Sequence, residues 1–373
     1  MIEEKTLNSI KKLGFGLMRL PMNGGEIDLA QTRKMADLFM EKGFTYFDTA
    51  YPYIGGKSEC AVKDALVARY PRESFYLADK LPPWAVKEPA DCRKIFDTQL
   101  SRTGAGYFDF YLLHALDKDK LKILDDNSVW EFARELKEKG LIRHLGFSFH
   151  DTADVLEKIL SGHPEMEFVQ LQINYADWDS DSVQSRLCYE TARRHEKPVI
   201  VMEPVKGGSL AMMTDEITGL FKTRSPGLSV ASWAVRFAAS LPGVLTVLSG
   251  MSNLEQMEDN LSYMEHFSPL SPQEQAVIGK VSEILRNTPT VPCTKCQYCV
   301  DGCPQGINIP GIFAALNHFK VYGNPVVAKN QYKGAVKDKG RASDCIACGN
   351  CESHCPQHIE IIETLKEAAK RFE

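Results

Sequence analysis

The chain has 373 residues, enough for one barrel-sized domain and a smaller second domain. Hydrophobic residues make up 44% of the sequence and charged residues 25%, which matches an ordinary globular protein. The net charge of -5 argues against nucleic acid or an anionic membrane as the main partner.

No run approaches the roughly 18 consecutive apolar residues that a membrane helix needs. The start of the sequence, residues 1–5, is charged and lacks the apolar core of a signal peptide. We therefore expect a cytoplasmic protein. In that compartment thiols normally stay reduced, so the 11 cysteines are available as metal ligands.

Short β-rich runs alternate with amphipathic helical stretches up to about residue 250. Most of these runs are continuously apolar, which is typical of parallel strands buried on both faces. The eight predicted strands lie at residues 12–17, 44–48, 75–80, 109–114, 144–149, 168–173, 199–203 and 245–249.

The intervening stretches have the signals of helices. Asp28 is a predicted N-cap for a helix that ends at Gly43, and Gly140 ends another helix that begins near Val129. Eight β–α alternations predict an α/β fold of the closed (β/α)₈ TIM-barrel type. The alternative, a doubly wound open sheet, would carry a G-x-G-x-x-G turn after an early strand, and the sequence has none.

A further helix is predicted after Ser271, and Pro289 and Pro292 then precede a cysteine-rich region. We place the domain boundary there. The predicted division is a barrel at 1–270, a linker helix at 271–288 and a small C-terminal domain at 289–373.

Eight cysteines form two identical C-x₂-C-x₂-C-x₃-C-P runs, and this duplicated spacing resembles a bacterial two-cluster ferredoxin. In such ferredoxins the fourth cysteine of each run usually binds the other cluster. The resemblance implies two [4Fe–4S] clusters. One would be bound by Cys293, Cys296, Cys299 and Cys355, and the other by Cys345, Cys348, Cys351 and Cys303.

Zinc is the alternative use of these thiols, but zinc sites normally pair C-x₂-C knuckles rather than triplets. The stretch 309–321 between the two runs has a helical pattern, so we expect a partly helical ferredoxin-like iron–sulfur domain. Cys60, Cys92 and Cys188 receive no role. Cys60 and Cys188 lie in predicted helices, where isolated cysteines are usually small core residues, and Cys92 has no recognisable partner.

Four polar residues are predicted at one mouth of the barrel. Asp48, Lys80 and His114 end consecutive strands, and Tyr53 follows the first of these by five positions. Each taken singly has an ordinary structural explanation, such as a helix cap, a solvated lysine or a buried histidine. Together they form a candidate catalytic group.

This group suits the reduction of a carbonyl. Hydride addition leaves an alkoxide that needs a proton, and Tyr53 can supply it if the neighbouring Lys80 ammonium lowers the pKa of the phenol. Asp48 would keep Lys80 charged. His114 would donate a hydrogen bond to the substrate oxygen.

These motifs are similar to those of a known family. D-T-A-x-x-Y at 48–53, S-E at 58–59, Lys80 and L-L-H at 112–114 resemble the aldo-keto reductase family over roughly residues 10–265. The resemblance implies that Tyr53 is the general acid. It also implies a nicotinamide cofactor, usually NADPH, across the barrel mouth.

Seven further residues match cofactor-contacting positions of that family. Ser148 and Gln170 match contacts to the nicotinamide carboxamide, and Met202 occupies the position of the aromatic ring that usually stacks on it. The remaining four lie in a segment similar to the adenosine-binding stretch of the potassium-channel β-subunit branch. They are Ser252, Gln256, Asp259 and Asn260.

Two replacements leave the cofactor open between NADPH, NADH and a flavin such as FMN. Phe149 stands where an asparagine is usual, and Met202 replaces the aromatic residue. A flavin also has a chemical motive, because a nicotinamide releases two electrons as hydride whereas each cluster takes one.

Three functions follow. The favoured one is an iron–sulfur aldo-keto reductase acting on a small aldehyde, ketone or quinone, with Trp84 as a candidate wall of its pocket. The second is a flavin-mediated electron-transfer enzyme on the same barrel. The third is a non-enzymatic, redox-sensing regulatory subunit. An external electron-transfer protein is a candidate partner.

Overall fold

The computed structural model describes residues 2–293, 295–355 and 357–373, which fold into two compact units. The first unit consists of Met1–Lys206 and Ser232–Gln275, and the second of Gly207–Ala231 and Ala276–Glu373. The sequence-based division assigned residues 207–231 to the barrel, whereas this segment folds with the C-terminal unit.

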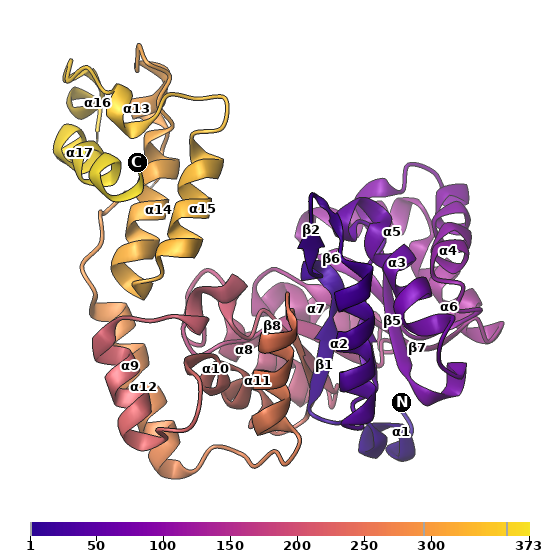
Figure 1. Ribbon diagram of the computed structural model, residues 1–373. Coiled ribbons are helices and arrows are strands. Elements are labelled where there is room, and N and C mark those ends of the chain that lie inside the picture. Colours follow the sequence, from indigo (N-terminus) through magenta and orange to yellow (C-terminus); the bar gives the residue numbers. More distant parts are fainter. Residues whose placement is uncertain (1, 294, 356) are drawn as a thin grey trace. The chain divides into compact units, whose positions relative to one another are not determined.

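Eight parallel strands in the first unit close into a barrel, which confirms the predicted fold (Figure 1). Their order around the barrel is β1-β10-β9-β8-β7-β6-β5-β4. The strands are β1 (Leu13–Gly16), β4 (Tyr46–Asp48), β5 (Tyr76–Leu81), β6 (Phe108–Leu116), β7 (Ile142–Phe149), β8 (Phe168–Gln172), β9 (Val199–Met202) and β10 (Val244–Ser249).

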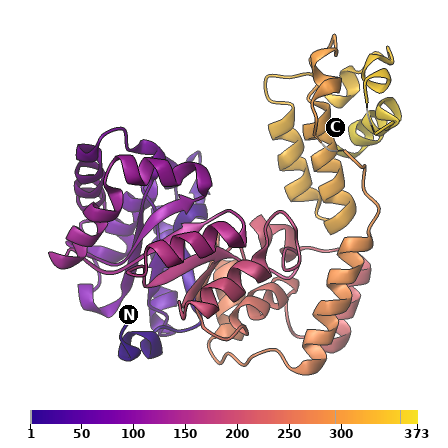
Figure 2. The same cartoon turned by 180° about the vertical axis from the view of Figure 1, so that it is seen from behind.

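Helices surround these strands in both views of the molecule (Figure 1; Figure 2). Asp28 caps the first of them as predicted, since its side chain accepts a hydrogen bond from the backbone of Gln31. The helices are α2 (Leu29–Glu41), α3 (Lys57–Val62), α4 (Pro89–Thr103), α5 (Lys118–Asp126), α6 (Val129–Glu138), α7 (Ala153–Gly162), α8 (Ser185–Arg194), α10 (Val230–Ala239) and α11 (Leu254–Met264).

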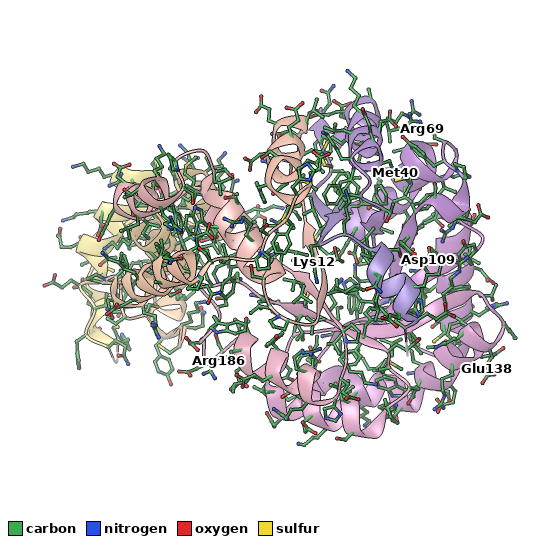
Figure 3. All side chains as sticks on the ribbon, turned by 90° about the horizontal axis from the view of Figure 1, so that it is seen from below. Lys12, Met40, Arg69, Asp109, Glu138 and Arg186 are labelled. Carbon is green, nitrogen blue, oxygen red and sulfur yellow. The ribbon has the colours of Figure 1, made fainter. Side chains whose placement is uncertain are left out.

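The amino-terminal end of the barrel is covered. Helix α1 (Glu4–Ser9) lies across this end when the molecule is seen from below (Figure 3). Its flanking residues Ile2 and Ile10 pack into the core formed by inward-facing strand residues. Asp109, labelled in the same view, forms an ion pair with Arg72 at 2.7 Å. The strands therefore present their carboxyl ends as the rim where loops can build a site.

Two local features were not predicted. A short hairpin, β2 (Met22–Asn23) and β3 (Glu26–Ile27), lies in the loop after β1. Helix α3 continues into a single π-helical turn at Lys63–Val67. Both features are too short to leave a periodic hydrophobic pattern in the sequence.

The second unit is built around helices. The predicted helix between the cysteine runs is α14 (Ile309–Tyr322), which lies beside α15 (Pro325–Ala335) in both views (Figure 1; Figure 2). The unit also contains α9 (Asp215–Arg224), most of α12 (Pro272–Asn287), α13 (Tyr298–Asp301), α16 (Asn350–Ser353) and α17 (Ile361–Phe372). Of the helices in the described ranges, none combines the length and hydropathy needed to span a bilayer.

The apolar core of this unit lies between α14, α15 and α17. Ile312, Phe313 and Leu316 of α14 are completely buried, as is Leu365 of α17. Two cysteines, Cys299 and Cys351, belong to the same core. The packing of the helices thus fixes the position of both cysteine runs.

Candidate active site and cysteine-lined cavities

The four predicted catalytic residues lie together at the carboxyl ends of the strands. Asp48 ends β4, Lys80 lies in β5 and His114 in β6, while Tyr53 lies in the turn that follows β4. The Nζ atom of Lys80 is 3.2 Å from the hydroxyl oxygen of Tyr53 and forms an ion pair with Asp48. The rings of Tyr53 and His114 have centroids 5.8 Å apart.

Burial sets the charge states of this group. Lys80 is 0% exposed and Asp48 2%. Burial alone would lower the pKa of Lys80, but its interactions with Asp48 and with the hydroxyl of Tyr53 outweigh burial, so the pKa is raised. The ammonium also donates to the backbone oxygen of Thr49 at 2.8 Å. The lysine is therefore held as a cation.

The phenol of Tyr53 differs from the prediction in one respect. Lys80 does act to lower its pKa, but burial has the larger effect and the pKa of Tyr53 is raised above its ordinary value. The prediction from sequence took account of the neighbouring charge but not of desolvation. At neutral pH the phenol keeps its proton, which is the state that a general acid requires.

His114 and Trp84 lie next to each other beside the phenol. Their ring centroids are 5.2 Å apart, and Trp84 is 47% exposed. Burial and then the charge of Lys80 lower the pKa of His114 well below its usual range, so the imidazole is neutral. Its Nδ1 atom has no hydrogen-bond partner among the residues that the structure describes. A neutral imidazole can donate one hydrogen bond.

Two of the predicted nicotinamide contacts have partners within the barrel. Gln170 donates a hydrogen bond to the carboxylate of Asp48 at 3.1 Å, and Ser148 accepts one from the backbone of Ala115 at 2.7 Å. Ala115 follows His114 and has a φ of 54°. Both side chains thus hold parts of the candidate catalytic group in place. Met202 ends β9 and is partly buried.

The predicted adenosine-binding segment surrounds the start of α11. The N-cap is Asn253 and the helix begins at Leu254, so Ser252 lies just before the helix. The backbone N–H of Ser252 donates to the side chain of Gln256 at 2.8 Å. Asn260 is buried and donates to Ser249 at 3.2 Å, while Asp259 lies partly exposed on the same helix. The helix N-terminus and its exposed side chains form the candidate binding surface.

A buried carboxyl pair behind the catalytic group was not predicted. Glu59 and Asp79 are both 0% exposed, and their side chains form a hydrogen bond with each other. Asp79 otherwise accepts from Gln99 at 2.9 Å, and Glu59 from Arg102 at 2.8 Å. Gly56 leaves the space that Arg102 fills, since a Cβ there would lie 2.6 Å from the guanidinium.

Burial determines which of these two carboxyl groups is protonated. Burial first, and then the charge of Glu59, raise the pKa of Asp79 well above its ordinary value. Asp79 therefore carries a proton and Glu59 remains the partner of Arg102. The signal available in the sequence was an acidic residue inside an otherwise apolar strand, directly before Lys80.

The eight C-terminal cysteines line two separate cavities. The first cavity is lined by Cys293, Cys296, Cys299 and Cys355, and the second by Cys303, Cys345, Cys348 and Cys351. Each cavity therefore combines three cysteines of one run with the fourth cysteine of the other. The remaining lining is mainly apolar, and Ile309 contributes to both cavities.

The two cysteine loops repeat the same backbone conformation. Lys295 and Gln297 flank one cysteine with positive φ angles of 59° and 71°, and Ala347 and Gly349 do so in the second run with 55° and 76°. Turns of this kind direct backbone N–H groups into a concavity that suits an anion. No three His, Cys, Asp or Glu side chains in the described ranges converge on a single-ion site. A cubane does not require that, because each thiolate binds a different iron.

The other three cysteines lie outside these cavities. Cys60 is exposed, and Cys92 and Cys188 are buried. Burial raises the pKa of Cys188 to about 12 and that of Cys92 to about 11, so both thiols stay protonated.

Two protein-family models match successive parts of the chain. The model of the aldo/keto reductase family matches residues 12–283, and that of a 4Fe-4S dicluster domain matches residues 292–360. An uncharacterized oxidoreductase of Bacillus subtilis, YqkF, is 27% identical over 278 residues, which is 68% of this chain and 86% of that protein. The 7-acetyl-epi-neemfruitin B aldo-keto reductase of Melia azedarach is 25% identical over 292 residues, or 73% and 85%.

Solved structures share the barrel. The holo form of the aldo-keto reductase AKR11C1 from Bacillus halodurans superposes with a TM-score of 0.59 at 24% identity, covering 73% of this chain and 92% of that one. An aldo/keto reductase from Klebsiella pneumoniae in complex with NADP and acetate gives a TM-score of 0.60 at 20% identity, with the same coverage. These likenesses establish the fold of the first unit.

Proposed function

The chain belongs to the aldo/keto reductase family and carries a 4Fe-4S dicluster domain, and on this premise we propose that it reduces a carbonyl group of a small aldehyde, ketone or quinone. The observation that supports the proposal most strongly is the contact of 3.2 Å between the phenol of Tyr53 and the ammonium of Lys80. Both groups are in the protonation states that proton donation to an alkoxide requires.

We propose a nicotinamide as the cofactor of the barrel. When bound, it supplies the hydride that reduces the carbonyl carbon. NADP is present in the related Klebsiella pneumoniae structure, and Ser148, Gln170 and Met202 lie around the same rim as the catalytic group. For the adenosine half we propose the N-terminus and first two turns of α11, with Ser252, Gln256, Asp259 and Asn260.

Each catalytic side chain has one task in this proposal. Tyr53 donates its proton to the developing alkoxide, and Lys80 stabilises the phenolate that remains. Asp48 balances the charge of Lys80, and Gln170 orients Asp48. His114, neutral and next to Trp84, donates a hydrogen bond to the substrate oxygen and so orients the carbonyl.

The variant Tyr53→Phe tests the proton donor. We expect the rate of carbonyl reduction to fall by a factor of roughly 10² to 10⁴, because a general acid contributes about that much. Tyr76→Phe is the matched control. Tyr76 lies at the start of β5, at the opposite end of the strand from Lys80, and its hydroxyl forms a hydrogen bond with Ser9 at 2.7 Å. A Tyr53→Phe enzyme with the wild-type rate would remove the acid from the mechanism.

The pH dependence gives a second test of the same group. The pKa of Tyr53 is raised and that of His114 is lowered, so neither group titrates in the neutral range. We expect a rate that is level from about pH 6.5 to about pH 10 and that falls above it as the phenol loses its proton. A decline centred near neutral pH would contradict this assignment.

For the second unit we propose two [4Fe–4S] clusters, one in each cysteine-lined cavity. The composition of the cavities supports the crossed ligand sets, with Cys355 completing the first and Cys303 the second. When bound, each cluster accepts or releases one electron. Anaerobic purification should yield about eight iron and eight sulfide ions per chain. A content of two zinc ions would contradict the proposal.

FMN is the second candidate for the barrel, because Phe149 and Met202 replace the usual residues of a nicotinamide site. The same anaerobic sample distinguishes the two cofactors. Flavin released by acid treatment and detected by its fluorescence would favour FMN, whereas NADPH or NADH binding without flavin would favour the nicotinamide.

A further inference from the structure

The second unit carries a segment rich in positive charge, which Asp338 within it and Glu373 near Arg341 offset in part. Five basic residues lie on α15 and in the turn that follows it, and we call them the basic face. They are Lys329, Lys333, Lys337, Lys339 and Arg341. Between residues 325 and 341 only one residue is acidic, so this segment has a charge of +4 in a chain whose net charge is -5.

The basic face is free to meet another molecule. All five side chains are exposed. Helix α15 buries Ala328 and Tyr332 in the core, so Lys329 and Lys333, four residues apart, lie along one exposed side of the helix. Within the described residues no carboxylate forms an ion pair with any of the four lysines, although other lysines of the unit, such as Lys320, are paired.

This surface borders the second cysteine-lined cavity. Gly340 pairs with Ile307 in a parallel β-bridge, and Ile307 lines that cavity. Lys339 and Arg341 therefore flank the cavity wall on both sides of the bridge. Ile346, which also lines the cavity, is 60% exposed, and the neighbouring Cys348 is exposed as well.

The first cavity lacks comparable charge. Its loop contains one lysine, Lys295, and the segment after Cys355 carries Glu360 and Glu363 before the first lysine of α17. The loop of the first cavity also has an exposed cysteine, Cys296, and an exposed aromatic residue, Tyr298, so the concentration of positive charge is what distinguishes the second cavity.

A binding site for an electron-carrier protein has these properties. Such encounters are small and transient, with an apolar centre and a charged rim that accelerates association. We propose that the basic face, together with Ile346, is the docking surface for an acidic one-electron carrier protein of the ferredoxin type. This inference rests on the proposed function, because a carrier needs a redox group in the adjacent cavity.

Charge reversal in the full, anaerobically purified chain tests the surface. The probe is an acidic bacterial ferredoxin, and the measurement is its dissociation constant at about 50 mM and about 500 mM salt. We expect K333E/K337E to weaken binding by a factor of about 10 to 100 at low salt. Wild-type binding should also weaken at high salt, and the variant should show a smaller salt dependence.

The matched control is K34E/K158E, which makes the same change in net charge on exposed lysines of α2 and α7 in the barrel. It should change the dissociation constant by no more than about twofold. Equal weakening by both variants, or no binding of ferredoxin to the wild-type chain at low salt, would overturn the proposal. Tighter binding of a single-stranded oligonucleotide than of ferredoxin would overturn it too.

Iron content and carbonyl reduction separate this inference from the proposed function. Both variants should retain the iron content and the reduction rate of the wild-type chain, since neither changes a cysteine or a barrel-rim residue. A chain that binds no iron–sulfur cluster contradicts the proposed function. A chain with intact clusters and unaltered ferredoxin binding in K333E/K337E contradicts the docking surface alone.

Discussion

The barrel rim and the cysteine-lined cavities hold their functional groups in different ways. At the rim, side chains are positioned by hydrogen bonds and an ion pair with other protein groups. Lys80 is fully buried and contacts Asp48, Tyr53 and a backbone oxygen. In the second unit, backbone turns with positive φ present thiols to a space, and Cys296 and Cys348 remain exposed. The rim is therefore preorganised by the protein itself, whereas the cavities are completed by what they bind.

This contrast predicts that a substitution at the rim lowers both the rate of carbonyl reduction and the free energy of unfolding. Lys80→Met should lower carbonyl reduction by a factor of roughly 10² to 10⁴. It should also cost about 3–5 kcal/mol of unfolding free energy, because Asp48 is left buried without its cation. Denaturant unfolding and initial rates are the measurements.

A double variant separates the two effects. In K80M/D48N the buried charge is gone, so most of the lost stability should return while activity does not. If the double variant is no more stable than Lys80→Met, the ion pair is not what holds the rim together.

In the cavities, replacing a single cysteine should lower the iron content of the chain and leave the structure of the barrel unchanged. Cys355→Ser should reduce the iron content from about eight to about four ions per chain, and so should Cys293→Ser, because both residues line the first cavity. The double variant C293S/C355S should lose no more iron than either single variant. C355S/C303S should lose nearly all iron, since these residues line different cavities. Loss of nearly all iron in C293S/C355S would instead mean that each run binds its own cluster, because Cys293 and Cys355 belong to different runs.

The buried carboxyl groups of Glu59 and Asp79 give a further test, in which the unfolding free energies of two variants are compared. Glu59→Gln should cost about 2–3 kcal/mol, because it removes the carboxylate that pairs with Arg102. Asp79→Asn should cost less than about 1 kcal/mol, since the raised pKa of Asp79 means that the native side chain is already neutral. Chemical denaturation near neutral pH compares the two. A larger cost for Asp79→Asn would place the proton on Glu59 instead.

The smallest expected effect concerns acid stability of the barrel. Burial opposes ionisation of Glu167, but its hydrogen bonds to His144 and Lys137 prevail and lower its pKa to about 2. A lowered folded-state pKa stabilises the fold above the unfolded value, near 4.3, and this contribution is lost as the pH falls toward 2. Glu167→Gln should cost about 1–2 kcal/mol at pH 6 and almost nothing at pH 2. Equal costs at both pH values would contradict this.

The sequence predicted best what depends on repeated local pattern. Eight apolar runs alternating with helical stretches predict the barrel, and the duplicated cysteine spacing predicts the crossed cavities. The positions of Asp48, Lys80 and His114 at strand ends were also accessible, because successive βα units place such residues at one rim.

What the sequence could not show depends on three-dimensional burial. The raised pKa of Tyr53 and the proton on Asp79 result from desolvation, which has no local sequence signature. The partner of Gln170 lies 122 residues away in Asp48, so its role in orienting the carboxylate emerges only from the fold. The same holds for Arg102 and Glu59, which meet across two helices.

The division of the chain into units also has a practical consequence for anyone who wishes to study the halves apart. Asn324 caps α15 and donates to the backbone of Gly208 at 3.1 Å, and Gly323 leaves room for Thr214. A polypeptide truncated before the first cysteine run would keep residues 207–231 but strip them of these partners. Each unit is therefore built from two separate segments of the chain, and truncation at a single position does not separate one complete unit from the other.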